Sequence, residues 1–569
     1  MLMGITPKEL AFTLYKIPDA NKYTSFCINK KNGGTRNILA PCDQLKWLQQ
    51  KLLELLYDCE DDYQTIRSSN TQFGFRRNCN IFENASRHTG RRHLLNLDLQ
   101  DFFDHINFGR VRGFFISDKR FALHKNVATT IAQIACFNNG LPQGSPCSPH
   151  IASLVSSFLD VRLIRFLRPR RCSYSRYADD ITISTNLKIF PSDVAIPLIG
   201  DPHGWTTAPE ISDIIVRAGF SLNPLKTRFS VRHSRQMVTG LVVNQRPNVP
   251  REFYLATRAM CDSYFKFGSS TAPKITEGFG RPCPTESDKK IDKNANPLQV
   301  LEGRLSYIHH IRELTDQRSI QQKQDSPTQF WSTLQHFYLF KNFMAHDAPV
   351  ILTEGPSDVF YIKSAISQTK LFLPNLIDPL SGKSGLARFF RFDGLAAKVL
   401  GVTGGSGNIK RLLYLYSKGF KRYNMTLRRN PIVIVIDNDS GGSDVIAMVN
   451  KIYGTSILTN DPQILHKVTD FVYLVKTPHV GAKTNTCIED LLPKSVVSVK
   501  LNGKSFFGGK KIDPAKQFGK VALSQYVQAN SGAIDFTGLE PILDAINSAI
   551  SSVITPPPAS PATAPNTCP

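Results

Sequence analysis

The sequence predicts a multidomain protein of mixed α/β and α+β class. A hairpin-like segment surrounds Tyr177–Asp180, which reads YADD. Farther along, Ile432–Ile436 is a run of five β-branched residues, which is typical of a strand buried on both faces of a parallel sheet. A length of 569 residues is enough for two or three domains with full cores.

The YADD segment is the first candidate site. In SYSRYADDITIST, apolar and polar residues alternate at period two on both sides of Asp179 and Asp180, which predicts two strands with the acids in the turn between them. Like charges repel at such a turn, whereas paired carboxylates suit a divalent metal ion. Taken alone, two acids in a loop are more typical of a solvated turn.

A third acid, Asp98, lies near the end of the strand-like segment 91–103, before a possible helix at 104–107. If this strand neighbours the hairpin, three carboxylates meet, and such a cluster can hold two Mg²⁺ ions for phosphoryl transfer. By itself, Asp98 would more commonly cap the next element.

Between these segments, residues 138–149 (NNGLPQGSPCSP) predict a rigid turn before an apolar helix at 151–159. Its small residues would let a base pair or a sugar approach the backbone closely. An ordinary loop before a core helix is the alternative.

In this order and spacing, LDLQDFF, LPQGSPCSP and YADD resemble the palm of reverse transcriptases. Asn84–His88 (NAxxH) and Val238–Gly240 (VTG) resemble blocks of the retron type, and the resemblance covers about residues 10–320. It implies a right-hand polymerase, with fingers and palm in 1–245 and a thumb in 246–345 that contains a flexible insertion near 268–297.

The resemblance also implies residue roles. Catalysis and metal binding would fall to Asp98, Asp179 and Asp180. Phe103 would be the steric gate against a ribose 2′-hydroxyl. Lys31 is an alternative to the adjacent Lys30 as a residue that binds the dNTP. The implied dNTP-binding residues are Lys30, Arg36, Phe103, Gln143 and Lys226. The implied RNA-recognition residues are Asn84, His88, Val238, Thr239 and Gly240.

A second set of acids follows two apolar strands. Glu354 and Asp358 stand in EGPSD after the first strand, and Asp437 and Asp439 follow the second. Acids at the carboxyl ends of parallel strands lie where open α/β folds bind ligands. We expect Asp437 and Asp439, two residues apart, to point to the same side. Ordinary surface acids at strand ends are the alternative.

Together, EGxxD and DxD resemble a Toprim domain, which implies a Rossmann-like fold over 346–550. Glu354 would then act in acid–base chemistry, and Asp437 and Asp439 would hold Mg²⁺. Less specific candidates for this site are Asp358, Glu489 and Lys520. Acids favoured at a helix N-terminus would explain Glu489 equally well. The sequence shows no companion domain with a nucleophilic tyrosine and no CxxC pair, which favours a nuclease within the Toprim group.

Bulk properties agree with a nucleic-acid enzyme. The net charge is +23, and a basic surface attracts phosphate. The eleven cysteines form no CxxC pair, which favours free thiols. We see no signal peptide and no membrane-length apolar run, so we expect a cytoplasmic bacterial protein. The proline-rich tail, 551–569, is expected to be disordered.

The resulting hypothesis is a retron RNA-directed DNA polymerase that makes branched multicopy single-stranded DNA (msDNA). Its partners would be a structured non-coding RNA, the DNA product, dNTPs and Mg²⁺. The Toprim part would be a nuclease-like effector in antiviral defence that acts on an unknown nucleic acid. Assembly of the chain into a homo-oligomer is an open alternative. The alternatives are an intron-like or protein-primed reverse transcriptase, and a nucleic-acid-sensing scaffold with an idle Toprim site.

Overall fold

The computed structural model describes residues 3–29, 34–64, 71–201, 204–268, 296–379, 381–382, 384–419, 422–424, 427–428, 430–509 and 511–554. Lys30, nearly all of the predicted insertion and the proline-rich tail from residue 555 lie outside the described residues. The chain divides into two compact units, one mainly up to Tyr254 and the other mainly from Gln317 onward. Helices α10 (Arg251–Phe267) and α11 (Pro297–Glu313), which fall in the predicted thumb, are divided between the units.

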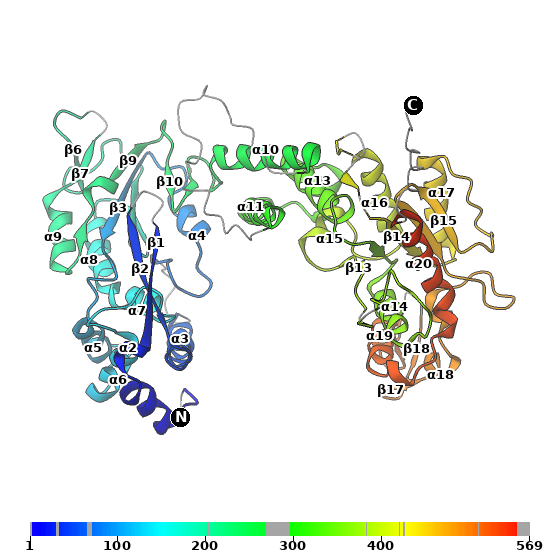
Figure 1. Cartoon of the computed structure of the whole chain (residues 1–569). Helices are drawn as coiled ribbons and strands as arrows, with labels where there is room; N and C mark the ends of the chain where they lie inside the picture. The colour runs from blue at the N-terminus through cyan, green and yellow to red at the C-terminus, as the bar shows by residue number, and fades with distance from the viewer. Residues whose placement is uncertain are drawn as a thin grey trace, which may run out of the picture. The chain divides into compact units, whose positions relative to one another are not determined.

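The first unit combines short strands with many helices (Figure 1). Its strands are β1 (Tyr23–Asn29), β2 (Thr35–Pro41), β3 (His93–Gln100), β4 (Ser173–Tyr177), β5 (Asp180–Thr185), β6 (Ala195–Pro197), β7 (Trp205–Thr207), β8 (Ser221–Leu222), β9 (Arg228–Val231), β10 (Met237–Val238) and β11 (Leu241–Val242). Its helices are α1 (Pro7–Ala11), η1 (Phe12–Lys16), α2 (Asp19–Lys22), α3 (Asp43–Gln64), α4 (Ile81–Ser86), α5 (Phe108–Ser117), α6 (Lys125–Ala135), α7 (Ser148–Val155), α8 (Ser157–Leu167), α9 (Pro209–Arg217) and η2 (Pro224–Lys226).

An antiparallel sheet of order β4-β5-β3-β8, with β9 also on β3, forms the centre of this unit. The predicted hairpin is confirmed, since β4 and β5 flank a two-residue turn at 178–179. Strand β3 is largely buried because its leucines pack with α5, α7 and α8 in one hydrophobic core. The sheet therefore places Asp98 and the YADD turn on a rigid base.

The possible helix at 104–107 is wrong. Residues 101–105 form turns, and α5 begins only at Phe108. The Asn107 side chain accepts a hydrogen bond from the Arg110 backbone N–H, which makes Asn107 the N-cap of α5. The preceding acid, Asp101, has φ +42°, a left-handed conformation that does not continue a helix.

The second unit surrounds another sheet (Figure 1). Its strands are β12 (Val350–Leu352), β13 (Arg388–Phe389), β14 (Ile432–Ile436), β15 (Leu465–Thr469), β16 (Val472–Lys476), β17 (Lys500–Leu501), β18 (Lys504–Phe506) and β19 (Gln517–Phe518). Its helices are α12 (Ile320–Asp325), α13 (Gln329–Phe343), α14 (Pro356–Gln368), α15 (Gly394–Leu400), α16 (Ser406–Gly419), α17 (Ser440–Tyr453), η5 (Ile488–Leu491), α18 (Lys494–Val497), α19 (Lys520–Ala529), η6 (Ser531–Ala533), η7 (Thr537–Leu539) and α20 (Glu540–Ile554).

The larger sheet of this unit has the order β13-β12-β14-β16-β15. The first four strands run parallel, and β15 is antiparallel to β16. All five residues of β14 are buried, as the β-branched run predicted. Val433 and Val435 pack in one core with α14, α19 and α20. Glu354 and Asp437 follow the carboxyl ends of the adjacent strands β12 and β14.

Helix α13 carries the aromatic stretch Phe330–Phe343. Its aromatic residues are buried, and the helix contacts α15 and α16 of the same unit. Within the part of the chain that the structure describes, no helix is long and apolar enough to cross a membrane.

Candidate functional sites

The YADD turn and β3 bring three carboxylates together. Asp98 and Asp180 are cross-strand partners of β3 and β5. Asp179 is the preceding turn residue, and its carbonyl oxygen accepts a hydrogen bond of 3.0 Å from the Leu99 N–H. The sequence predicted this meeting on the condition that the two strands are neighbours, and the register fulfils that condition.

The three acids crowd one another. Loss of solvation, followed by the charges of Asp179 and Asp98, raises the pKa of Asp180 to about 6. The pKa of Asp179 is also raised, chiefly by burial. The Lys226 ammonium lies 2.9 Å from Asp98 Oδ2, and this hydrogen bond raises the lysine's pKa. One lysine thus partly compensates three carboxylates, and more cation is needed for all three to be ionised.

Carboxylate oxygens are the ligands that Mg²⁺ prefers, so this donor set fits the predicted metal. Among the described residues, no three His, Cys, Asp or Glu side chains stand close enough together to ligate one ion. One of the three carboxylates, Asp98, is paired with the Lys226 ammonium.

Of the predicted dNTP-binding residues, Lys226 and Arg36 interact with these acids. Arg36 is an exposed residue of β2, and its positive charge works against the rise in the pKa of Asp179. Phe103 is partly buried, with its ring centroid 6.3 Å from that of Phe75. The Gln143 backbone oxygen accepts a hydrogen bond of 2.8 Å from the Leu39 N–H of β2. Lys30 lies outside the described residues, so its position is not given.

Gly144 of the LPQG block makes a close backbone contact with β2, and the predicted approach of a base pair or a sugar stays a prediction. Its φ is +130°, and a Cβ there would lie 2.5 Å from the Leu39 backbone oxygen. A side chain at this position would therefore push against β2. In the described structure, the close approach joins the palm block to the fingers hairpin.

The two residues of the first retron block that were predicted to recognise RNA are buried, which does not fit direct contact of their side chains with RNA. Asn84 and His88 are 1% and 0% exposed. The Ser175 hydroxyl donates to Asn84 Oδ1 over 2.5 Å. Because this uses the only proton of that hydroxyl, His88 Nε2 is the donor in its 2.7 Å hydrogen bond with Ser175. On its other side, His88 Nδ1 accepts from the Ser184 hydroxyl, also over 2.7 Å. These side chains hold β4 to β5 because each serine belongs to one of the two strands.

The second retron block is a tight hairpin turn. Val238 of β10 is 1% exposed and pairs with Leu241 of β11. Thr239 and Gly240 have φ values of +45° and +82°, and the exposed Gly240 adopts its conformation without a side-chain clash. The Thr239 hydroxyl donates to the Ile81 carbonyl at the start of α4. The second block therefore contacts α4, the helix that carries Asn84, and its Gly240 lies at the surface.

We expect His88→Ala to lower the free energy of unfolding of the first unit by about 2–4 kcal/mol, because it leaves a cavity and buried serine hydroxyls without partners. Burial, with the Arg91 and Arg87 charges, lowers the pKa of His88 to about 3. The native state thus keeps His88 neutral while the unfolded chain binds a proton near pH 6.5, so the stability from His88 is lost as pH falls from about 6.5 toward 3. Urea unfolding at pH 7 and pH 5 measures both effects. If the free energy of unfolding differed between pH 7 and pH 5 by the same amount in the variant as in the wild type, this role of His88 would be contradicted.

Glu354 connects the two strands that lead into the second acid cluster. Its Oε1 accepts a hydrogen bond of 3.1 Å from the Ser406 N–H, and its Oε2 accepts one of 3.4 Å from the Asp437 N–H. Its backbone oxygen accepts from the Gly405 N–H over 2.7 Å. The glycine-rich segment therefore lies against Glu354, where it holds the carboxylate beside the end of β14.

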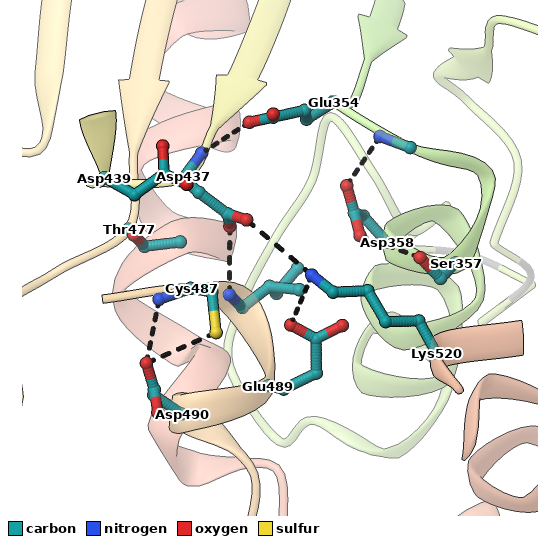
Figure 2. Close-up of polar contacts among 12 residues, drawn as sticks. Glu354, Ser357, Asp358, Asp437, Asp439, Thr477, Cys487, Glu489, Asp490 and Lys520 are labelled. Atoms are coloured by element: carbon teal, nitrogen blue, oxygen red, sulfur yellow. Dashed lines mark hydrogen bonds and ion pairs between the residues drawn. The ribbon is translucent and has the colours of Figure 1, made fainter. Parts of the chain in front are cut away.

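The three less specific candidates surround Asp437, as Figure 2 shows. The Lys520 ammonium lies 2.9 Å from Glu489 Oε2 and 3.9 Å from Asp437 Oδ2. Asp437 Oδ1 accepts a hydrogen bond of 3.0 Å from the Ile488 N–H. Asp358 accepts from the Gly355 N–H and from the Ser357 hydroxyl, which places it at the start of α14. Residues far apart in the sequence thus form one buried cluster.

The second cluster is also short of positive charge. Burial, with the charges of Asp358, Glu354 and Glu489, raises the pKa of Asp437 to about 8, although Lys520 opposes the shift. Burial works against the charge of Lys520, but Glu489 and Asp437 outweigh it and raise the lysine's pKa. The other oxygen of Glu489, Oε1, is buried without a hydrogen-bond partner. Such a donor set fits a divalent cation.

The expectation that Asp437 and Asp439 point to the same side is wrong. Strand β14 ends at Ile436, so the alternation of a strand does not extend to these acids. Asp437 turns toward Lys520 (Figure 2). Asp439 Oδ1 instead accepts a hydrogen bond from the Gly442 N–H and caps α17. Burial raises the pKa of Glu354 and the charge of Asp439 adds to the rise, so these two acids are electrostatic neighbours.

Residues 28–249 match the family model described as reverse transcriptase (RNA-dependent DNA polymerase). The chain is 31% identical over 247 residues to the retron Ec86 reverse transcriptase of Escherichia coli, a match that covers 43% of this chain and 70% of that protein. The chain belongs to the retron reverse transcriptases. The family model ends near the close of the first unit, so the second unit is interpreted from its own residues.

Other relatives agree with this assignment. The chain is 32% identical over 260 residues to the retron Mx65 reverse transcriptase of Myxococcus xanthus, covering 42% of this chain and 55% of that protein. It therefore spans little more than half the length of that relative. A solved structure of apo telomerase from Candida tropicalis aligns with 13% identity over 41% of this chain and 56% of that one, and its TM-score of 0.29 is too low to support an argument about fold.

Two polar residues beneath the YADD turn of this retron reverse transcriptase were not predicted from the sequence. Arg176 is 0% exposed and forms a buried ion pair with Asp160 of α8. The signal was present in the alternation, because Arg176 occupies the same face of β4 as the buried Tyr174. A charged residue at an inward position of a strand requires a partner, and that partner is distant in the sequence.

Proposed function

We propose that the first part of the chain is an RNA-directed DNA polymerase that copies a dedicated structured non-coding RNA into branched msDNA. The observation that carries this proposal is the register of β3 and β5, which brings Asp98 and Asp180 together beside Asp179 in a retron-family chain. The net charge of +23 favours binding of the RNA template and the DNA product. The priming group would be a guanosine 2′-hydroxyl of the RNA.

In this proposal, Asp98, Asp179 and Asp180 hold Mg²⁺. Bound there, the metal would activate the attacking hydroxyl and neutralise charge on the leaving pyrophosphate. Lys226, now paired with Asp98, would move to the phosphates of an incoming dNTP, and Arg36 would assist it. Phe103 would exclude a ribose 2′-hydroxyl beside the catalytic acids. Lys30 and Gln143 remain proposed dNTP contacts.

The nucleic acid that co-purifies with the full chain tests this function. We expect an RNA joined to single-stranded DNA through a 2′–5′ branch, which a debranching enzyme converts to linear RNA and linear DNA. Linear RNA alone, or DNA primed from a protein side chain, would favour the intron-like or protein-primed alternative. Absence of any DNA, together with no dNTP incorporation by the purified protein, would favour the scaffold alternative.

For the second unit we propose a Toprim nuclease-like effector of about residues 346–550, following fingers and palm in 1–245 and a thumb in 246–345. Support comes from the parallel sheet and from Glu354 beside Asp437 at its carboxyl edge. Glu354, Asp437 and Asp439 would provide the carboxylates for Mg²⁺, and Glu354 would take part in proton transfer. Antiviral defence, with the msDNA restraining the effector, is the role that we propose for the whole chain.

We expect Glu354→Gln to abolish growth arrest when phage infects cells that carry the complete system. The substitution keeps the shape of the side chain but removes the charge that a metal ion and a proton transfer need. Colony counts and phage plaques measure the effect, and msDNA levels should stay within about twofold of the wild type. Full growth arrest in the variant would rule out the effector assignment.

A further inference from the structure

A buried ion pair lies directly beneath the YADD turn. Arg176 Nε and Nη2 donate to the two oxygens of Asp160 over 2.7 and 2.6 Å. The Tyr174 hydroxyl donates to the same carboxylate over 2.6 Å. Both partners are buried, with Arg176 0% and Asp160 5% exposed. Strand β4 is thereby joined to α8 through one carboxylate with three donors.

The third nitrogen of the guanidinium reaches the turn itself. Arg176 Nη1 donates to the Ala178 carbonyl oxygen over 2.9 Å. Ala178 has φ +57°, a left-handed conformation that costs about 1–2 kcal/mol for a residue with a Cβ. The next residue is Asp179. The Arg176 guanidinium thus donates to the backbone at the strained Ala178, directly before Asp179 and Asp180.

The other side of the turn is supported by backbone. The Phe73 N–H donates to the Arg176 oxygen over 2.9 Å, and the Arg176 N–H donates to the Thr71 oxygen over 2.8 Å. A Cβ on Gly74 would lie 2.5 Å from the Ala178 nitrogen. The turn therefore lies between the Thr71–Gly74 segment and the Arg176 guanidinium, and the backbone approaches closely at Gly74.

We propose that Arg176, held by Asp160, is a positioning residue for DNA synthesis that fixes the left-handed turn and thereby aims Asp179 and Asp180 at Asp98. The inference rests on the proposed polymerase function. Well-packed apolar residues often replace a buried ion pair without loss of stability, so stability alone does not explain this one. The guanidinium can bind a carboxylate with two nitrogens and donate from its third nitrogen to another acceptor, a fixed fork that the single nitrogen of a lysine does not provide.

The test uses the full chain, with dTTP incorporation on a poly(rA)–oligo(dT) template in MgCl₂ as its readout. The proposal requires that Arg176→Lys keep the charge but lose the bond to Ala178, so we expect kcat to fall about 10²-fold. The KM for dTTP should stay within about twofold and the melting temperature within a few degrees. The matched control is Asp193→Asn, which breaks the part-buried Arg170–Asp193 pair of the same unit and should leave kcat unchanged.

Tyr174→Phe is the second variant, since it removes only one of the three bonds to Asp160. We expect kcat to fall about tenfold without a change in melting temperature. If Arg176→Lys folds, a kcat within threefold of the wild type would overturn the proposal. If Arg176→Lys does not fold, the same result in Tyr174→Phe would overturn it. So would an equal loss of kcat in Asp193→Asn. A wild-type chain that incorporates no dTTP would instead overturn the polymerase function.

Discussion

The double substitution Asp179→Asn with Asp180→Asn should reduce dNTP incorporation by more than about 10³-fold. Asparagine keeps the size of each side chain but removes two of the three charges that would bind Mg²⁺. Incorporation of labelled dTTP on a primed RNA template measures the loss. The fold should persist, because burial, followed by the charges of Asp179 and Asp98, raises the pKa of Asp180 and so disfavours its ionised form in the folded protein. We therefore expect a melting temperature equal to or slightly above that of the wild type.

Asp104→Asn is the matched control for this experiment, since Asp104 is an exposed acid only six residues after Asp98. It should keep incorporation within about twofold of the wild type. Unchanged incorporation in the double variant would disprove the assignment of Asp179 and Asp180. A fall in melting temperature of many degrees would instead indicate that the two acids stabilise the turn.

Lys520→Met should destabilise the second unit by about 3–5 kcal/mol at neutral pH. The substitution leaves Glu489 and Asp437 buried without their cation, and an uncompensated buried charge is costly. The raised pKa of Asp437 sets the direction of the pH dependence. A carboxyl group whose folded pKa is about 8 stabilises the fold when protonated, and that stability is lost as pH rises from about 4 through 8. Without Lys520, this pH dependence should become steeper.

Thermal unfolding of the full chain at pH 5.5 and pH 8 measures the effect. Lys516→Met, at an exposed lysine near Lys520, is the control and should change the melting temperature by no more than about one degree. Millimolar Mg²⁺ should raise the melting temperature of Lys520→Met more than that of the wild type, because the variant has the larger excess of carboxylate. Equal stability of the two proteins at pH 8 would show that Lys520 does not neutralise the cluster.

Local patterns predicted the strands well, and they predicted side-chain roles less well. The alternation around YADD and the run Ile432–Ile436 correctly indicated a hairpin and a buried parallel strand, because period and β-branching are local properties. Asn84 and His88 were predicted to take part in RNA recognition, and they lie in the interior of the first unit. Their motif was recognisable from the sequence, whereas their burial depends on which strands α4 packs against.

The sequence by itself determined which acids are the candidate catalytic residues, the order in which they occur and the family to which the chain belongs. The spacing of Asp98, the LPQG block and YADD was enough for that, since each motif is contiguous in the chain. Only the tertiary structure decided that Asp98 faces Asp180, that Lys520 enters the cluster of Asp437, and that Arg176 supports the turn. The physical reason is that strand register and long-range ion pairs depend on the packing of the whole unit, which no local pattern encodes.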